Sequence, residues 1–406
     1  MNWPVKKLGD ILSTAEIFTD GDWVESKDQD VNGSIRLLQL ADVGDGNFIN
    51  KSNRFINEST FIRLKCTEVQ RGDILIARMP DPLGRACIFE GISQKCITVV
   101  DVCIIRVDSN IVDARWLMHA INSDSVRRQI SSFAKGATRV RISRKNLSHI
   151  QIEFPPLAEQ QRIAALLDTA DRILKQRESA IAKLDQLAQS VFVEMFGDVV
   201  SNNKNWNQLC INEIAANEKY SIVDGPFGSS LKPTDYLETG VPVIRIANVT
   251  KDGYFLPKNL LYISKEKFKE LKRSSVCGDD VLVTRVGTIG NTCIFPNNFG
   301  DALLSTTGVC KIKPNRELVM PSYLHASIKT KSFQAQINKS ASTSVQKYFN
   351  LTALKSWKIS IPPLHLQNEF IKKINLINDE ITKHQQCLHQ IKNLEFSLQH
   401  QSFAVN

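Results

Sequence analysis

Residues 155–157 and residues 362–364 both read Pro-Pro-Leu, and the two motifs lie 207 positions apart. The same offset recurs upstream, where Trp116 aligns with Tyr323. A unit of this length is a whole domain with an appendage, far longer than the roughly 20 to 50 residues of a solenoid repeat. The 406-residue chain is therefore predicted to hold two globular domains of the same fold.

Each copy of the repeat is predicted to combine short strands with short helices. Runs rich in branched apolar residues, separated by glycine and aspartate turn signals, predict strands at residues 35–40, 74–77, 243–246 and 281–284. Helical segments are expected at residues 114–132 and 321–338, with Pro321 suited to a first helical turn. The domains are therefore expected to belong to the α+β class.

A long helix is predicted after each Pro-Pro-Leu motif, because apolar residues then recur in steps of three and four, the spacing of a coiled-coil seam. The first seam is Leu167, Ala170, Leu174, Arg177, Ile181, Leu184, Ala188, Val191 and Met195, and the second is Ile374, Ile377, Ile381, His384, Leu388, Ile391 and Leu398. Arg177 and His384 are polar interruptions at equivalent positions. We interpret them as residues that fix the helix register, the alternative being chance placement of a snorkelling side chain.

Antiparallel packing of the two helices would convert the direct repeat into a pseudo-two-fold arrangement and separate the globular domains by a helical ruler. DNA presents its half-sites at intervals of a helical turn, which such a ruler can match. The predicted organisation is a first domain at residues 1–157, a central helix at 158–197, a second domain at 198–364 and a distal helix at 365–406.

The composition favours a polyanionic partner and offers little catalytic chemistry. The net charge is +9 and the isoelectric point is near 9.0. The sequence contains no phosphate-binding P-loop, no zinc-deaminase motif and no Cys-x-x-Cys pair. The nuclease-like Glu-Ser-Lys at residues 25–27 lacks well-placed acidic partners and is interpreted as a surface loop. We expect no metal or cofactor site on this chain.

The cysteines and the apolar pattern predict where the protein resides. Cys87 and Cys293, like Cys103 and Cys310, occupy equivalent strands and are interpreted as buried core residues. No apolar run approaches the ~18 residues that span a bilayer, and the N-terminus has no signal-peptide pattern. A reduced, cytoplasmic setting without membrane contact is expected.

The candidate DNA-binding residues are cations and hydrogen-bond donors in loops and at strand ends. A basic loop at residues 135–145 has a counterpart at 339–347 that is richer in hydroxyl and amide groups. Arg78 and Arg285 each follow a buried strand and would either enter a DNA groove or form internal salt bridges. The full set is Arg78, Lys135, Thr138, Arg139, Arg141, Arg144, Lys145, Ser229, Lys232, Arg245, Arg285, Ser344, Gln346 and Lys347.

Three motifs support a resemblance that covers essentially the whole chain: Pro-Pro-Leu-Ala-Glu-Gln-Gln-Arg-Ile at residues 155–163, Met-Phe-Gly-Asp at 195–198, and Asp-Gly-Pro-Phe-Gly-Ser at 224–229. With the repeated long helix, they resemble the specificity subunit of type I restriction-modification systems. The resemblance implies a non-catalytic reader whose two target recognition domains each bind one half of a bipartite DNA sequence. It also implies helices that set the spacer and dock two methyltransferase subunits.

The same resemblance assigns the catalytic chemistry to other proteins. Methyltransferase and restriction or translocase subunits would bind S-adenosylmethionine, ATP and magnesium. Two other interpretations stay open at this point: a self-contained endonuclease or methyltransferase, and a coiled-coil scaffold with no role on DNA.

The two copies also differ. After the second Pro-Pro-Leu, the Glu-Gln-Gln element is replaced by the sequence His-Leu-Gln-Asn-Glu at residues 365–369. The first domain has Thr-Asp-Gly-Asp-Trp at residues 19–23, where the second has Asp-Gly-Pro-Phe-Gly at 224–228. This divergence predicts that the two halves of the DNA target are different.

Overall fold

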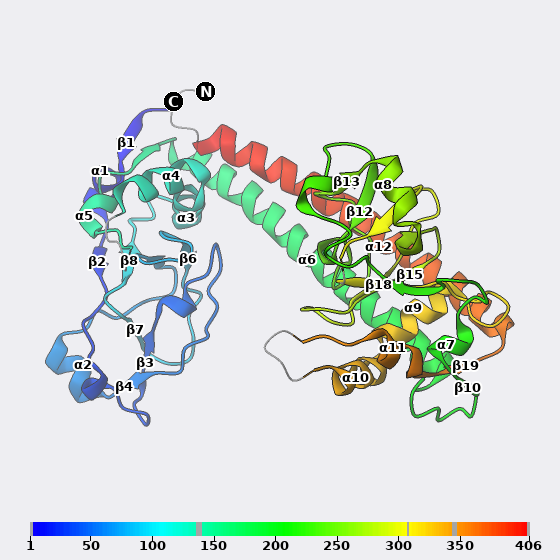
Figure 1. Cartoon of the computed structure of the whole chain (residues 1–406). Coiled ribbons are helices and arrows are strands. Elements are labelled where there is room, and N and C mark those ends of the chain that lie inside the picture. Colours follow the sequence, from blue (N-terminus) through cyan, green and yellow to red (C-terminus); the bar gives the residue numbers. More distant parts are fainter. Residues whose placement is uncertain (1–2, 135–139, 307, 343–346, 404–406) are drawn as a thin grey trace. The chain divides into compact units, whose positions relative to one another are not determined.

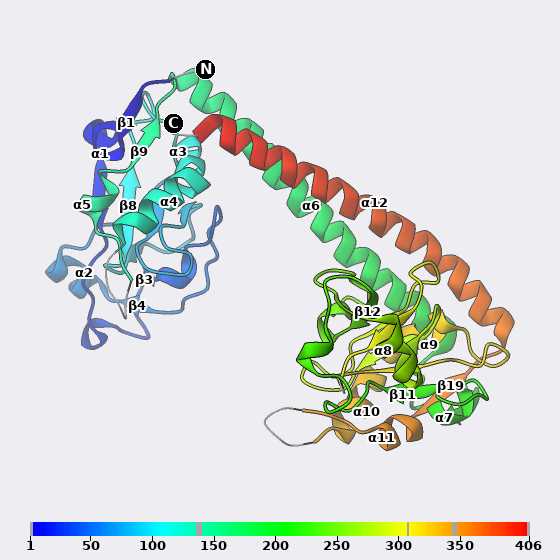
Figure 2. The same ribbon diagram turned by 45° about the horizontal axis from the view of Figure 1, so that its top comes forward.

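The computed structural model describes residues 3–134, 140–306, 308–342 and 347–403, and the chain divides into two compact units (Figure 1). The first unit contains residues 1–179 and 385–406, and the second contains residues 180–384. Both described ends of the chain, Trp3 and Phe403, belong to the first unit (Figure 2). Each unit is thus built from a globular domain and parts of two long helices.

The first unit has a four-stranded antiparallel sheet in the order β2-β8-β5-β6, formed by Ile17–Asp20, Val102–Arg106, Ile74–Ala77 and Ala86–Ile88. A three-stranded sheet has the order β4-β3-β7, from Phe55–Ile56, Ile35–Leu38 and Cys96–Thr98. Strand β1 (Val5–Lys7) pairs with β9 (Gln151–Glu153). The helices are α1 (Leu8–Ile11), α2 (Glu58–Leu64), α3 (Ala114–Asn122), α4 (Asp124–Phe133) and α5 (Arg144–Leu147), with 3₁₀ turns η1 (Leu12–Thr14), η2 (Ser26–Asp28) and η3 (Leu40–Asp42).

The second unit repeats this topology. Its four-stranded antiparallel sheet has the order β11-β18-β15-β16, from Ile222–Asp224, Val309–Ile312, Val281–Thr284 and Thr292–Ile294. The other sheet has the order β13-β12-β17-β14, from Leu261–Ile263, Val241–Ile244, Ala302–Leu304 and Ser275–Val276, and β10 (Asn207–Cys210) pairs with β19 (Lys358–Ile361). The helices are α7 (Ile211–Ile214), α8 (Lys265–Glu270), α9 (Pro321–Lys329), α10 (Lys331–Ser340) and α11 (Leu351–Ser356), with 3₁₀ turns η4 (Pro233–Asp235), η5 (Ile246–Asn248) and η6 (Lys272–Ser274). The predicted α+β repeat is confirmed.

Each predicted helical segment is divided into two helices. Ser123 adopts an extended backbone between α3 and α4, and its hydroxyl accepts a hydrogen bond from the Val126 amide. Thr330 caps α10 in the same way through the Phe333 amide. A hydroxyl side chain at an N-cap satisfies a free amide of the first turn, which explains why a new helix begins at each position.

The central strands have apolar residues on both faces because the sheet lies between two cores. In β5, Ile74 and Ile76 enter the core that also contains α3 and the start of the long helix, whereas Leu75 and Ala77 enter a second core. Successive side chains of a strand point to opposite faces. Each fully buried Leu or Ile stabilises the fold by about 1.5–3 kcal/mol, so these strands are the rigid base from which the loops extend.

The buried cysteines confirm the interpretation of their strands. Cys87, Cys103, Cys293 and Cys310 are 0% exposed and unpaired. Burial raises the pKa of each of these thiols to about 12, so they remain protonated and behave as small apolar residues.

The two long helices are α6 (Leu157–Phe196) and α12 (Leu364–Phe403), each 40 residues and thus about 60 Å long. In the first unit, Lys392 of α12 lies 3.7 Å from Glu178 of α6, and Phe403 packs in the core with Ile163. In the second unit, the rings of Phe192 and Phe370 are 5.3 Å apart. The start of each helix therefore pairs with the end of the other, which confirms the antiparallel pairing.

The predicted seam residues are all buried or half-buried, so the seam is confirmed. Arg177 and His384 lie half-buried on it. Their role in fixing register remains a prediction. Among the described residues, no helix has the length together with the apolar character that crossing a bilayer requires.

Candidate nucleic-acid interface

Arg78 lies at the end of β5 and joins two other segments of the first unit. Its guanidinium forms an ion pair with Asp20 at the end of β2, with 3.0 Å between nitrogen and oxygen, and donates a hydrogen bond of 2.6 Å to the Val100 carbonyl. Burial lowers the pKa of Arg78, while the Asp20 carboxylate opposes that shift. The residue is only 3% exposed. Its geometry therefore favours the internal salt bridge over insertion into a groove.

Arg285 repeats this arrangement in the second unit. Its guanidinium forms an ion pair with Asp224 at the end of β11, and its Nε donates to the Phe349 carbonyl at 3.1 Å. The backbone of each arginine also accepts a hydrogen bond, from Ile142 at 3.1 Å in the first unit and from Phe349 at 3.2 Å in the second. Ile142 and Phe349 are 207 positions apart; Ile142 lies in the second half of the first predicted loop, and Phe349 lies two residues after the second. Both arginines therefore anchor the end of a candidate loop.

The described part of the first basic loop presents cations at its surface. Arg141 forms an ion pair of 3.0 Å with Asp101 and is 41% exposed at its side chain. Arg144 donates to the Phe18 carbonyl at 2.9 Å and lies over the Phe18 ring. Lys145 is exposed. Lys135, Thr138 and Arg139 lie outside the described residues.

The corresponding loop of the second unit is described only at its end. Lys347 is exposed, and its carbonyl accepts a hydrogen bond of 2.9 Å from the Gly287 amide. Ser344 and Gln346 lie outside the described residues. The other candidates of this unit lie elsewhere: Ser229 and Lys232 are exposed in the segment after β11, and Arg245 is half-buried and donates to the Asn259 carbonyl.

Two exposed aromatic residues were not among the predicted site residues. Trp23 is 69% exposed and follows Asp20 by three positions, and Phe227 is 68% exposed and follows Asp224 by three positions. Arg273 lies over the Phe227 ring. Large exposed aromatics beside cations are a common feature of nucleic-acid binding surfaces. The shared spacing from the strand-end aspartate was the signal in the sequence.

A buried glutamine fixes the start of each long helix. The Gln160 side chain accepts from the Asp113 amide at 2.9 Å and donates to the carbonyls of Pro155 and Ile111 at 3.0 and 3.3 Å. Gln367 makes the equivalent set with Met320, Pro362 and Leu318 at 2.8, 2.8 and 3.0 Å. Both glutamines are 0% exposed. The second copy has thus kept the one residue of the Glu-Gln-Gln element that binds the adjoining domain.

The long helices expose apolar residues at an equivalent position. Leu187 of α6 is 48% exposed and Leu394 of α12 is 58% exposed, and the two are 207 positions apart. Neither lies on the seam. Among the described residues, no group of three histidine, cysteine or acidic side chains is placed to hold a metal ion.

The model of the type I restriction modification DNA specificity domain matches residues 1–183 and again residues 203–393. The chain therefore belongs to this family.

Named relatives extend over most of the chain. The EcoBI specificity subunit of Escherichia coli is 25% identical over 335 residues, which cover 74% of this chain and 67% of that protein. The putative MjaX specificity subunit of Methanocaldococcus jannaschii is 24% identical over 400 residues, covering 94% and 88%. All these relatives are specificity subunits of type I restriction enzymes, as their names state.

Solved structures share the fold. The S subunit of a type I restriction-modification system from M. genitalium has a TM-score of 0.59 at 16% identity and covers 100% of this chain and 97% of that one. A chain from a study of assembly in a type I restriction-modification system has a TM-score of 0.57 at 16% identity and covers 99% and 97%. At this identity, the likeness establishes the fold alone.

Proposed function

We propose that this chain is the non-catalytic reader of a type I restriction-modification complex and that each globular domain recognises one half of a bipartite DNA target. The observation that carries the proposal is the duplication of a whole domain in which both copies anchor a loop in the same way. Arg78 and Arg285 lie at the ends of equivalent strands of the two units, and each forms an ion pair with a strand-end aspartate. Each also accepts a backbone hydrogen bond, from Ile142 or from Phe349.

The loop residues supply the contacts that such a reader needs. Arg141 and Lys145 in one unit and Lys347 in the other would neutralise phosphates. The arginine, hydroxyl and amide groups of the two loop sequences are the kinds of side chain that read bases. Trp23 and Phe227 would stack on or wedge against bases. The net charge of +9 supports long-range attraction to DNA.

The half-sites are expected to differ because the loops differ. The first loop carries five arginine and lysine residues between positions 135 and 145, whereas the second carries hydroxyl and amide groups at most of its positions. Arginine favours guanine and amides favour adenine in the major groove. Two such loops are suited to an asymmetric target.

The long helices would set the spacer and dock two methyltransferase subunits. Leu187 and Leu394 give each helix an exposed apolar residue at the same repeat position, as two copies of one partner would require. Those partners, with restriction or translocase subunits, would bring S-adenosylmethionine, ATP and magnesium. We place the complex in the cytoplasm.

The test is to sequence the methylated sites in a host that carries this chain with its partner subunits. We expect a bipartite sequence, and exchange of the second domain for that of a relative should change one half only. Activity of the purified chain alone, abolished by a point substitution within it, would sink the proposal.

The spacer has its own test. Matched insertions of four residues into α6 and α12 would lengthen the helix pair by about 6 Å, close to two base pairs of DNA. The two half-sites should then be retained with a longer spacer. A change in stability alone, with the spacer unaltered, would remove the helices from that role.

A further inference from the structure

A charged cluster joins α3 to the helix pair in the first unit. Arg115 and His119 of α3 both bind Asp168 of α6: Arg115 Nη2 lies 2.9 Å from Oδ1, and His119 Nε2 lies 2.8 Å from the same oxygen. Glu395 of α12 lies half-buried close to Asp171. Large polar side chains thus connect these three helices.

The second unit has a cavity of 1340 Å³ at the equivalent place. Each residue of this cluster has a counterpart 207 positions away in the sequence. The counterparts of Arg115, His119, Asp168 and Asp171 are the smaller or neutral residues Ser322, Ala326, Asn375 and Asn378, and those of Glu395 and Lys392 are Ala188 and Asp185. All six counterparts line the cavity. The cavity is therefore lined by smaller or neutral residues at positions where the first unit has the charged cluster.

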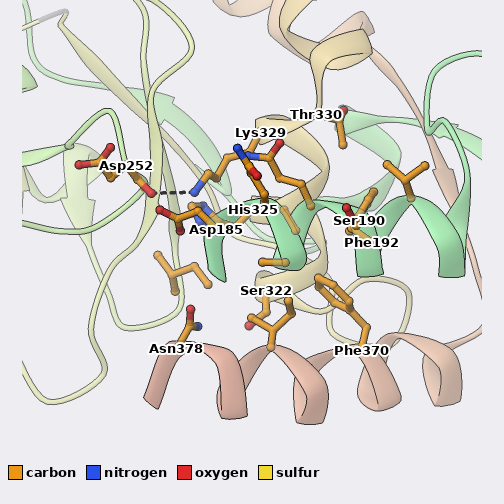
Figure 3. A pocket seen from close by; sticks show the side chains of 18 of the residues that line it. Asp185, Ser190, Phe192, Asp252, Ser322, His325, Lys329, Thr330, Phe370 and Asn378 are labelled. Atoms are coloured by element: carbon orange, nitrogen blue, oxygen red, sulfur yellow. Dashed lines mark hydrogen bonds between the residues drawn. The ribbon is translucent and has the colours of Figure 1, made fainter. Parts of the chain in front are cut away.

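The cavity has a polar end and an apolar end (Figure 3). Asp185, His325 and Lys329 are grouped near Asp252, to whose carbonyl the Lys329 ammonium donates at 2.6 Å. Phe192 and Phe370 form the apolar part, with ring centroids 5.3 Å apart. An occupant must therefore present a polar group and an apolar flank together.

One buried polar atom at the polar end has no hydrogen-bond partner. Within the described part of the chain, that atom is His325 Nδ1. The Asp185 carboxylate is half-buried, and the Lys329 ammonium is the cation that acts on it. Burial lowers the pKa of His325 to about 3, so the imidazole is neutral and one of its nitrogens is an acceptor. Buried polar groups are nearly always satisfied, which points to a donor supplied from outside the chain.

The charges that line the cavity favour a cation. Its carboxylates are Asp185, Glu194, Asp198 and Asp252, against two ammonium groups, Lys329 and Lys331. A phosphate would meet net repulsion here, whereas a guanidinium can donate to both a carboxylate and an imidazole. In the first unit, the chain's own Arg115 supplies this group to Asp168.

We propose that this cavity is a binding site for an arginine side chain of a second protein, with the guanidinium at Asp185 and His325 and the neighbouring apolar residues on Phe192 and Phe370. This proposal rests on the proposed function only in that a protein partner binds the helix pair, and it does not involve DNA. In the second unit, the partner's arginine would take the place that the chain's own Arg115 has in the first unit.

The test uses the full chain and a capped peptide that carries one arginine between leucines, with binding measured by calorimetry. Replacing the arginine by citrulline, which keeps the shape and removes the charge, should weaken binding about tenfold or more. Equal affinity for the two peptides would overturn the proposal. Tighter binding of spermidine than of the arginine peptide would also overturn it, in favour of a free amine.

Variants of the chain locate the site. S322R/N375D transplants the ion pair of Arg115 with Asp168 into the cavity and should abolish binding of the arginine peptide. D185N keeps the shape and should weaken binding about tenfold. The matched control D301N removes an exposed carboxylate of the same unit and should leave the affinity unchanged. If D185N and S322R/N375D bind the arginine peptide like the unaltered chain, the proposed site is wrong. That failure would not affect the proposed function, which is tested separately by the DNA sequence that the complex reads.

Discussion

The two units share the order of their four-stranded antiparallel sheet and the same anchoring contacts, yet they differ in their loops and beside the long helices. Gln160 and Gln367 make matching hydrogen bonds, and the strand-end ion pairs recur. The loops beyond those ion pairs have different chemistry, and a charged cluster in one unit corresponds to a cavity in the other. Contacts that hold the fold together are the same in both copies, whereas the surfaces proposed to bind DNA and a partner protein differ.

The largest effect on stability is expected at the paired glutamines, and because their hydrogen bonds match, the loss should be equal in the two units. Q160A and Q367A each leave a buried amide and two carbonyls without their partner, which should lower the free energy of unfolding of the affected unit by about 3 kcal/mol. Hydrogen exchange resolved by unit would measure it. Q161A and N368A, at exposed neighbouring positions, are the matched controls and should cost under about 0.5 kcal/mol. A large loss in only one unit would break the equivalence of the two helix starts.

The strand-end arginines should separate the two units. R78A leaves the Asp20 carboxylate without a cation and should cost about 2–3 kcal/mol, because a partly buried charge loses its partner. R285A should cost about 1 kcal/mol, since Arg273 remains 3.9 Å from Asp224. Chemical denaturation, monitored separately in each unit, would measure both losses of unfolding free energy. Equal losses would mean that Arg273 does not compensate, and R273A/R285A would then match R285A alone.

The exposed aromatics test whether both units use the same kind of DNA contact. W23A and F227A should each weaken binding of the target DNA by about tenfold in the complex, because loss of a base contact costs about 1–3 kcal/mol. The free energy of unfolding should stay within about 0.5 kcal/mol, since both side chains are exposed. Binding measured on duplexes with one half-site altered would assign each residue to its half. Unchanged affinity in both variants would remove the aromatics from the interface.

The smallest change is expected in the salt dependence. R139A/R141A should lower the slope of log affinity against log salt by about two units, since each lost phosphate contact contributes about 0.9. K347A in the second unit should lower it by about one. Binding titrations between low and moderate salt would supply the slopes. An unaltered slope for R139A/R141A would reassign the basic loop to another role.

Local patterns were sufficient to predict several central strands, such as β5 and β15, the long helices and the seam, because each depends on an apolar run or on steps of three and four residues. The short strands β1, β4 and β10 were not predicted, and the predicted strand at 243–246 ends at Ile244. The break at Ser123 depends on one capping hydroxyl and was not visible in the apolar pattern. The ion pair between Asp20 and Arg78 requires the strand order β2-β8-β5, which joins residues far apart in the chain.

The candidate site was less accessible to sequence reasoning than the fold. Arg285 could be placed at a strand end, but its inward direction follows from Asp224 and Phe349. The cavity is lined by residues that are smaller than their counterparts in the first unit, such as Ala326 where the first unit has His119. The sequence alone could not predict the cavity, because it does not show that these residues of three helices lie around one space.

The division of both long helices between the units has a consequence for the order of folding during synthesis. Every residue of the second unit lies between positions 180 and 384, whereas the first unit also needs residues 385–403, including Phe403 in its core beside Trp116. A chain made from its N-terminus therefore completes the second unit first. The domain that leaves the ribosome first waits for the last helical turns to close its own core.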